Sequence, residues 1–192
     1  MTRRKKSSVK RRQKFDSNGN LIMPISSTLV QNESNDLRNL YAGMTSIDDE
    51  NRRSACMLLE NLFSKSVNKN DIFEKIANPE LLNKLNLRLV DQIQSVRLHS
   101  VGAIKNLTYN CPEMTVDRLK DAGIIDTILC QCAQEMKSVR EANTEILILH
   151  LDAIRHLCIA SEEIVEMVRE REILDLMITM VREREREREI LD

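Results

Sequence analysis

The chain has 192 residues, of which 42% are hydrophobic but only 3% are aromatic, with no Trp, four Gly and three Pro. An aliphatic composition with few glycines and prolines favours helices and argues against a sheet protein. The formal net charge of -1 hides an asymmetry, because residues 1–14 hold eight basic side chains and no acid, which leaves 21 basic against 30 acidic residues elsewhere. The chain is therefore predicted to be a basic tail on an acidic body.

The basic cluster falls in a segment with the composition of a disordered tail. Residues 1–33 show little apolar periodicity and are interrupted by glycine, proline, serine and asparagine, so they bury too little surface to offset the entropy of ordering. Their spaced cations suit an acidic groove of an importin-type transport receptor or a phosphate backbone. We predict an importin-binding nuclear import signal; weak direct contact with nucleic acid and a purely solubilising role are the alternatives. The predicted importin-binding residues are Arg3, Arg4, Lys5, Lys6, Lys10, Arg11, Arg12 and Lys14.

After the tail, apolar residues recur at helical spacing. Cys111-Pro112 and Gly123 mark breaks, since proline starts helices and glycine separates them. The sequence predicts three units over residues 34–160, followed by a partial repeat and a charged C-terminal helix over 161–192. The predicted helices are 34–43 and 48–64 in the first unit, 72–77, 79–90 and 95–109 in the second, and 112–122, 124–136 and 142–159 in the third.

The units form an internal repeat. The stretches "NRRSACMLLENLF", "SVRLHSVGAIKNLT" and "ILILHLDAIRHLC" place Leu62, Leu107 and Leu157 in register, at spacings of 45 and 50 residues. Periods of this length with two or three helices are typical of armadillo and HEAT solenoids, and a short first helix of three favours the armadillo arrangement. The expected fold is all-α: an armadillo/HEAT-type α-solenoid with a disordered basic N-terminal tail.

A polar residue precedes each leucine of the repeat: Asn61, Asn106 and His156. In an armadillo stack the third helices line the concave face, so these side chains are predicted to form a peptide-groove ladder that hydrogen-bonds an extended backbone. The alternative is that each polar residue only spaces its helix at a solvated position. Gly102 lies inside a predicted third helix, where it costs about 1 kcal/mol relative to alanine. We expect it to allow the close approach of a neighbouring helix.

The final segment alternates Arg and Glu, which indicates a charged, solvated helix. It also carries an aliphatic stripe with no further repeat to follow it. This stripe is expected to have no packing partner and to favour self-association, as in a repeat array that is cut short. Its residues are Ile173, Leu176, Met177 and Met180.

The sequence shows no pattern that indicates catalysis or a bound cofactor. It has no Gly-rich phosphate loop, no H-E-x-x-H and no nucleophile in a known catalytic context, so we expect a non-enzymatic protein without cofactor or metal. Five scattered cysteines indicate reduced core thiols, and the spacing of Cys130 and Cys132 does not suit a zinc knuckle. A charged N-terminus without an apolar segment predicts a soluble intracellular protein with no membrane partner.

Residues 1 to about 160 resemble the N-terminal region of the symportin family, also called HEAT repeat-containing protein 3. The resemblance is carried by the tail "VKRRQKFDSNGN" and by "NRRSACMLLENLF" and "SVRLHSVGAIKNLT" in that order. It implies an adaptor and chaperone that carries 5S-RNA-associated large-subunit ribosomal proteins into the nucleus in support of ribosome biogenesis. It also implies that an importin engages the basic tail and that the protein shuttles between cytoplasm and nucleus. The alternative is a general armadillo-repeat protein-binding scaffold whose basic tail binds nucleic acid.

Overall fold

The computed structural model describes residues 14–15, 21–22, 33–64, 76–137 and 144–191. Most of the predicted tail, and all of its importin-binding cations except Lys14, therefore lie outside the described residues. Lys14 belongs to a short pairing of β1 (Lys14–Phe15) with β2 (Leu21–Ile22), which run antiparallel. All other regular structure in the described ranges is helical, so the prediction of an all-α fold is confirmed.

The helices begin and end close to the predicted positions. The predicted helix at 72–77 lies almost entirely outside the described residues. The helices are α1 (Glu33–Met44), α2 (Asp49–Ser64), α4 (Pro79–Leu89), α5 (Gln94–Asn110), α6 (Pro112–Asp121), α7 (Ile124–Lys137), α8 (Thr144–Ala160), α9 (Glu162–Glu170) and α10 (Ile173–Leu191).

Local sequence signals explain where the helices start and stop. Asn78 caps α4, and its side-chain oxygen accepts a hydrogen bond of 3.0 Å from the Leu81 amide, while Pro79 occupies the first turn. Pro112 likewise opens α6. Gly123 separates α6 from α7 with a φ of 69°, a left-handed conformation that only glycine adopts without strain.

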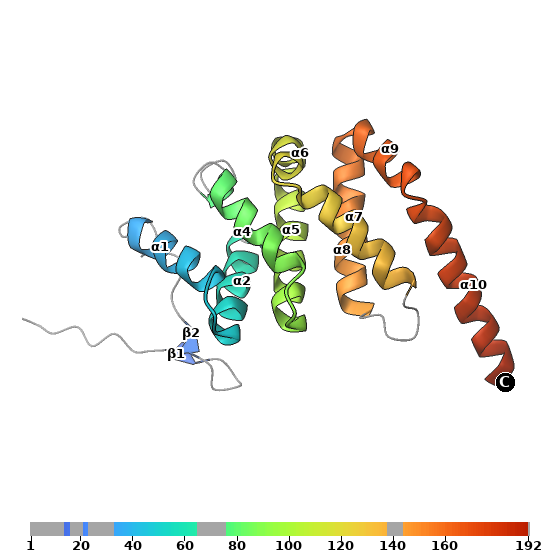
Figure 1. Cartoon of the computed structure of the whole chain (residues 1–192), viewed down its shortest axis with the longest axis horizontal. Helices are drawn as coiled ribbons and strands as arrows, with labels where there is room; N and C mark the ends of the chain where they lie inside the picture. Colours follow the sequence, from blue (N-terminus) through green and yellow to red (C-terminus); the bar gives the residue numbers. More distant parts are fainter. Residues whose placement is uncertain (1–13, 16–20, 23–32, 65–75, 138–143, 192) are drawn as a thin grey trace, which may run out of the picture. The chain divides into compact units, whose positions relative to one another are not determined.

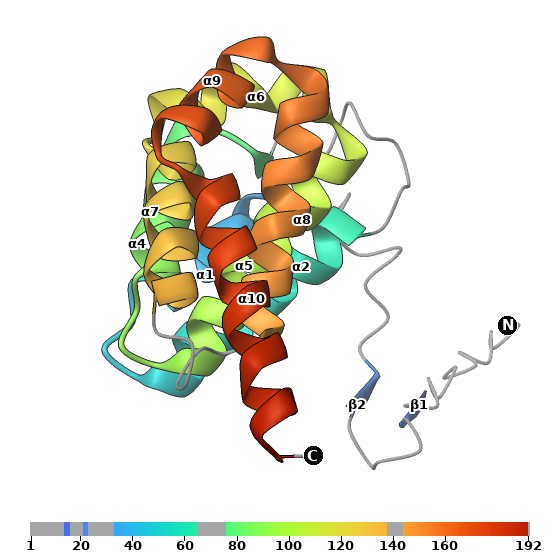
Figure 2. The same cartoon turned by 90° about the vertical axis from the view of Figure 1, so that its right-hand side faces the viewer.

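From Arg38 onward the helices form two rows (Figure 1). The long third helices make one row, in which α5 packs between α2 and α8. The second helices make the other, in which α7 packs between α4 and α10. Figure 2 shows the rows as separate layers, with α4 and α7 on one side and α2, α5 and α8 on the other. The core between them is aliphatic, as the composition predicts, and includes Leu59, Leu85, Ile104, Ile128 and Leu157, each at most 1% exposed.

The expectation that the C-terminal stripe lacks a partner is wrong. Ile173 is buried, and Leu176, Met177 and Met180 are half-buried, because α10 continues the row of second helices and packs against α7. The partner of this stripe therefore precedes it in the chain. A different set of apolar side chains on α10 is exposed: Leu174, Ile178 and Val181.

Candidate protein-binding surface of the third helices

The first ladder residue to consider is Asn106, which lies half-buried on α5. Its Nδ2 donates a hydrogen bond of 3.0 Å to the backbone carbonyl of Glu60 on α2. One turn later, Asn110 Nδ2 donates to the carbonyl of Phe63 at 2.6 Å and to that of Asn106 at 3.0 Å. Both amides thus join α5 to the third helix of the preceding repeat. At least one donor of Asn106 is used inside the solenoid.

His156 occupies the equivalent position on α8 and is buried. Its ring lies 5.2 Å from the ring of Tyr109 on α5, and its Nε2 lies 3.1 Å from Nη2 of Arg155. Burial and the neighbouring Arg155 cation lower the pKa of His156, and the smaller opposite effect of the Asp152 carboxylate does not offset them. The imidazole is therefore neutral at physiological pH and lies against α5 as Asn106 lies against α2.

Asn61, the third ladder residue, is exposed on α2. Its backbone carbonyl accepts a hydrogen bond of 2.9 Å from Ser64 Oγ. The three ladder positions thus differ in surroundings: Asn61 is open, Asn106 is shared with the neighbouring helix, and His156 is buried. Peptide binding by this ladder stays a prediction.

Glu60 and His99 make a side-chain hydrogen bond between α2 and α5 that was not predicted from sequence. Glu60 Oε2 lies 2.7 Å from His99 Nδ1. The carboxylate passes over Gly102, where an added Cβ would stand only 2.2 Å from Glu60 Oε1. The expectation that Gly102 allows a close approach is therefore confirmed, and the approaching group is a side chain of the neighbouring helix.

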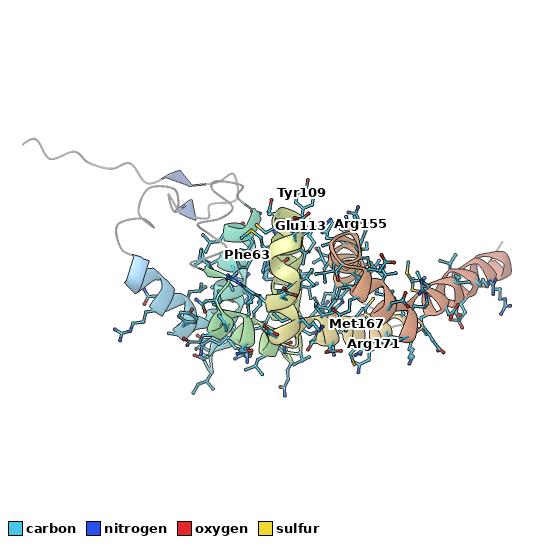
Figure 3. The ribbon with its side chains drawn as sticks, turned by 90° about the horizontal axis from the view of Figure 1, so that it is seen from above. Phe63, Tyr109, Glu113, Arg155, Met167 and Arg171 are labelled. Atoms are coloured by element: carbon cyan, nitrogen blue, oxygen red, sulfur yellow. The ribbon has the colours of Figure 1, made fainter. Side chains whose placement is uncertain are left out.

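Exposed apolar side chains also recur in register, three residues beyond the ladder. Tyr109 is 66% exposed on α5, and Ile159, at the same 50-residue spacing as Asn106 and His156, is 74% exposed on α8. Arg155 is exposed beside them, and Figure 3 shows Tyr109 and Arg155 projecting from successive third helices toward the same edge. We call Tyr109, Arg155 and Ile159 the exposed row. The repeat register already contained this signal, but only the structure shows that the row is exposed.

The cysteines of the described residues differ in burial and in reactivity. Burial raises the pKa of Cys56 to about 11 and that of Cys132 to about 12, so neither is a ready nucleophile. Cys130 is exposed whereas Cys132 is buried, so the two thiols do not share a surface. Among the residues placed by the structure, no three His, Cys, Asp or Glu side chains are grouped to hold a metal ion. No helix in the same ranges has the length and apolar character needed to cross a membrane.

The sequence matches no protein-family model, and no curated protein matches it. Solved structures do match. A designed armadillo repeat protein superposes with a TM-score of 0.58 at 20% identity, over 73% of this chain. An engineered protein solved in crystals by the Northeast Structural Genomics Consortium superposes with a TM-score of 0.59 at 16% identity, over 75% of this chain.

The match to these engineered proteins defines the class of fold. This chain is an armadillo-type α-solenoid, which confirms the predicted architecture. It spans about half the length of the two solved proteins, 54% of each. At this level of identity the likeness concerns the fold alone.

Proposed function

We propose that the solenoid is a non-enzymatic scaffold that binds partner proteins along its third helices. The observation that carries this proposal is the exposed row, in which large apolar side chains recur in register on successive helices. Exposed apolar groups that gather on one surface are typical of interaction sites. Tyr109 also packs against the buried His156 ring, which holds it in place for a partner.

The partners we propose are 5S-RNA-associated large-subunit ribosomal proteins, which the chain would accompany into the nucleus as an adaptor and chaperone. The symportin-like motifs in the tail and in the first two units support this assignment. Charge supports it as well, because residues 15–192 hold 30 acidic against 21 basic side chains, and ribosomal proteins are basic. An importin-type receptor would bind the cations from Arg3 to Lys14, and the protein would shuttle between cytoplasm and nucleus.

Deleting residues 1–14 tests the import role. Because the chain is only 22.2 kDa, it is fused to a reporter too large to diffuse through nuclear pores. The fusion is expected to accumulate in the nucleus with the tail and to stay in the cytoplasm without it, since the tail carries the cations that a transport receptor would bind. A matched control replaces the eight cations with glutamine at constant length. Nuclear accumulation of either altered fusion would contradict the proposal.

A binding assay with purified 5S ribosomal proteins tests the cargo role. We expect Tyr109→Glu and Ile159→Glu to weaken binding at least tenfold, because each places a charge in the exposed row. Leu87→Glu is the control: Leu87 is 58% exposed on α4, in the other row of helices. If all three variants bind equally well, the exposed row is not the cargo site.

The alternative function, a general scaffold whose tail binds nucleic acid, is favoured by the density of cations in residues 1–14. A salt titration distinguishes it. Binding of RNA through the tail should fall steeply as salt rises, because phosphate contacts release counterions. Binding of a protein cargo by the exposed row should fall less steeply with salt, because apolar contacts contribute to it, and it should persist after the tail is deleted.

A further inference from the structure

Two cations lie in register at the exposed row. Lys105 on α5 precedes Tyr109 by four residues, which places both side chains on the same helix face. Arg155 on α8 precedes Ile159 by the same number. Lys105 is half-buried and Arg155 is exposed. A cation one turn before an exposed apolar side chain therefore occurs twice, on successive third helices and at the same 50-residue spacing.

The charges of both cations remain available to a ligand. No carboxylate in the described ranges forms an ion pair with Lys105. Arg155 Nη2 lies 3.5 Å from Asp152 Oδ1 and 3.1 Å from Nε2 of the neutral His156. Because a guanidinium carries five N–H donors, most donors of Arg155 are still open. Burial lowers the pKa of His156, and Arg155 and Lys105 add to this shift, which indicates that both cations lie near the same ring.

The equivalent positions on α2 lack this pattern. They hold Glu60 and Ser64. Glu60 carries the opposite charge and already hydrogen-bonds to His99. Ser64 offers a hydroxyl in place of an apolar group. The combination of cations with exposed apolar side chains is therefore confined to α5 and α8.

We propose that the exposed row, together with Lys105, binds an extended partner segment in which an acidic side chain lies beside apolar ones, a selectivity that rests on the proposed function of binding proteins along the third helices. The carboxylate would lie between Lys105 and Arg155, and the guanidinium can donate two parallel hydrogen bonds to it. Apolar side chains next to the acid would contact Tyr109 and Ile159. Neighbouring helices pack about 8–10 Å apart and an extended chain advances about 3.3 Å per residue, so about three residues would reach from α5 to α8.

The surroundings favour a single carboxylate over a nucleic acid. Residues 15–192 hold 30 acidic against 21 basic side chains, so a polyanion would meet net repulsion beyond the two cations. Ile159 is aliphatic and offers no ring on which a second base could stack. One acidic side chain needs only Lys105 and Arg155. A basic cargo can present such a segment, because the acidic remainder of the body can meet its cations elsewhere.

Two pools of short capped peptides test this proposal. Both are random mixtures of leucine, phenylalanine and serine, to which one pool adds glutamate and the other lysine. The protein is the full chain with its eight tail cations replaced by glutamine, so that the tail does not bind the acidic pool. Fluorescence anisotropy is expected to show binding of the glutamate pool about tenfold tighter than binding of the lysine pool.

Reversing the two cations gives the sharpest result. The double variant Lys105→Glu/Arg155→Glu should prefer the lysine pool, because the row then presents two carboxylates. If this variant loses its helical spectrum, Lys105→Gln/Arg155→Gln replaces it and should bind both pools equally. The control Lys137→Glu/Arg182→Glu makes the same change in net charge at exposed positions on α7 and α10 and should keep the preference for glutamate.

Three results would overturn the proposal: no preference for glutamate with the row unaltered, a preference that survives reversal of both cations, or tighter binding of a short oligouridine than of the glutamate pool. The cargo assay is separate. If 5S ribosomal proteins fail to bind but the peptide preference inverts as expected, the cargo is wrong and the selectivity for acidic segments stands. If they bind through Tyr109 and Ile159 without a preference for glutamate, only the selectivity is wrong.

Discussion

Arg52 donates two hydrogen bonds to Asp91, one from Nε to Oδ2 at 2.9 Å and one from Nη2 to Oδ1 at 3.2 Å. The pair joins α2 to the turn between α4 and α5, 39 residues further along the chain. The side chain of Asp91 is only 4% exposed. It also accepts hydrogen bonds from Arg88 Nη1 at 2.7 Å and from the Ile93 amide at 3.0 Å. Burial alone would raise the pKa of Asp91, but the bonds from Arg52 and Ile93 lower it below its ordinary value.

Replacing Asp91 is therefore expected to destabilise the solenoid. Asp91→Ala should lower the free energy of unfolding by about 2 kcal/mol, because it removes the carboxylate that accepts hydrogen bonds from the half-buried Arg52 and Arg88 and leaves Arg52 with Asp49 as its ion-pair partner. Urea denaturation measures the change. The control is Glu163→Ala, which removes an ion pair with Lys120 whose members are both about half exposed and should leave the midpoint unchanged. Equal effects of the two substitutions would mean that Asp91 contributes no more than a surface charge.

Two glycines should respond differently to alanine. Gly123 has a φ of 69°, so Gly123→Ala is expected to cost about 1 kcal/mol of stability. Gly102 has helical geometry, and alanine there gains up to about 1 kcal/mol in helix propensity. That gain is offset because the new methyl displaces Glu60 from His99, so Gly102→Ala alone should be nearly neutral.

A double-mutant cycle checks the role of Glu60 at Gly102. In a Glu60→Ala background no side chain has to move, so Gly102→Ala should then stabilise the protein by about 1 kcal/mol. Thermal or urea unfolding of the four proteins gives the coupling. If Gly102→Ala has the same effect in both backgrounds, the close approach of Glu60 does not limit this position.

The repeat period and the helix boundaries could be predicted because they depend on local signals. The 45- and 50-residue spacings, Pro112 and Gly123 lie in the sequence itself, and the structure places breaks at both residues. The Arg52–Asp91 pair could not be predicted, because it depends on how one repeat packs against the next. Arg52 has several acidic neighbours in sequence, and nothing local selects Asp91.

The ladder shows the same limit within the candidate site. Its register could be predicted from Leu62, Leu107 and Leu157, but the direction of its side chains could not. Whether Asn106 faces a groove or the preceding helix depends on the interhelix distance, which brings the Glu60 carbonyl within 3.0 Å. The packing of the final stripe also required the structure. The stripe lies on α10 and packs against α7, and two helices, α8 and α9, separate α7 from α10 in the chain.

His150 is expected to make stability depend on pH. It is 2% exposed on α8, and neither ring nitrogen has a hydrogen-bond partner among the described residues. Burial, with a smaller contribution from the Arg97 cation, lowers its pKa from 6.5 to about 4. Between pH 6.5 and about pH 4, His150 is protonated in the unfolded chain and neutral in the folded chain. The contribution of the neutral ring is therefore complete above pH 6.5 and is lost as pH falls toward 4, a change of about 3 kcal/mol.

His150→Leu isolates this contribution, because leucine has a similar volume and no polar atoms to bury. Urea midpoints measured from pH 7.5 to 4.5 should decline more steeply for the unaltered chain than for the variant. At pH 7.5 the variant should be at least as stable, since it removes two unpaired buried nitrogens. Parallel declines of the two proteins would show that protonation of His150 does not govern acid sensitivity.

Asn106 and Asn61 should differ in their contribution to stability although they occupy equivalent ladder positions. Asn106→Ala removes the hydrogen bond to the Glu60 carbonyl and is expected to lower the free energy of unfolding by about 1 kcal/mol. Asn61→Ala changes an exposed side chain and should alter it by less than about 0.5 kcal/mol. Both are measured at a concentration where the chain is monomeric, so that self-association does not contribute. If the two substitutions cost the same, the Asn106 hydrogen bond adds nothing to the stability of the α2–α5 interface.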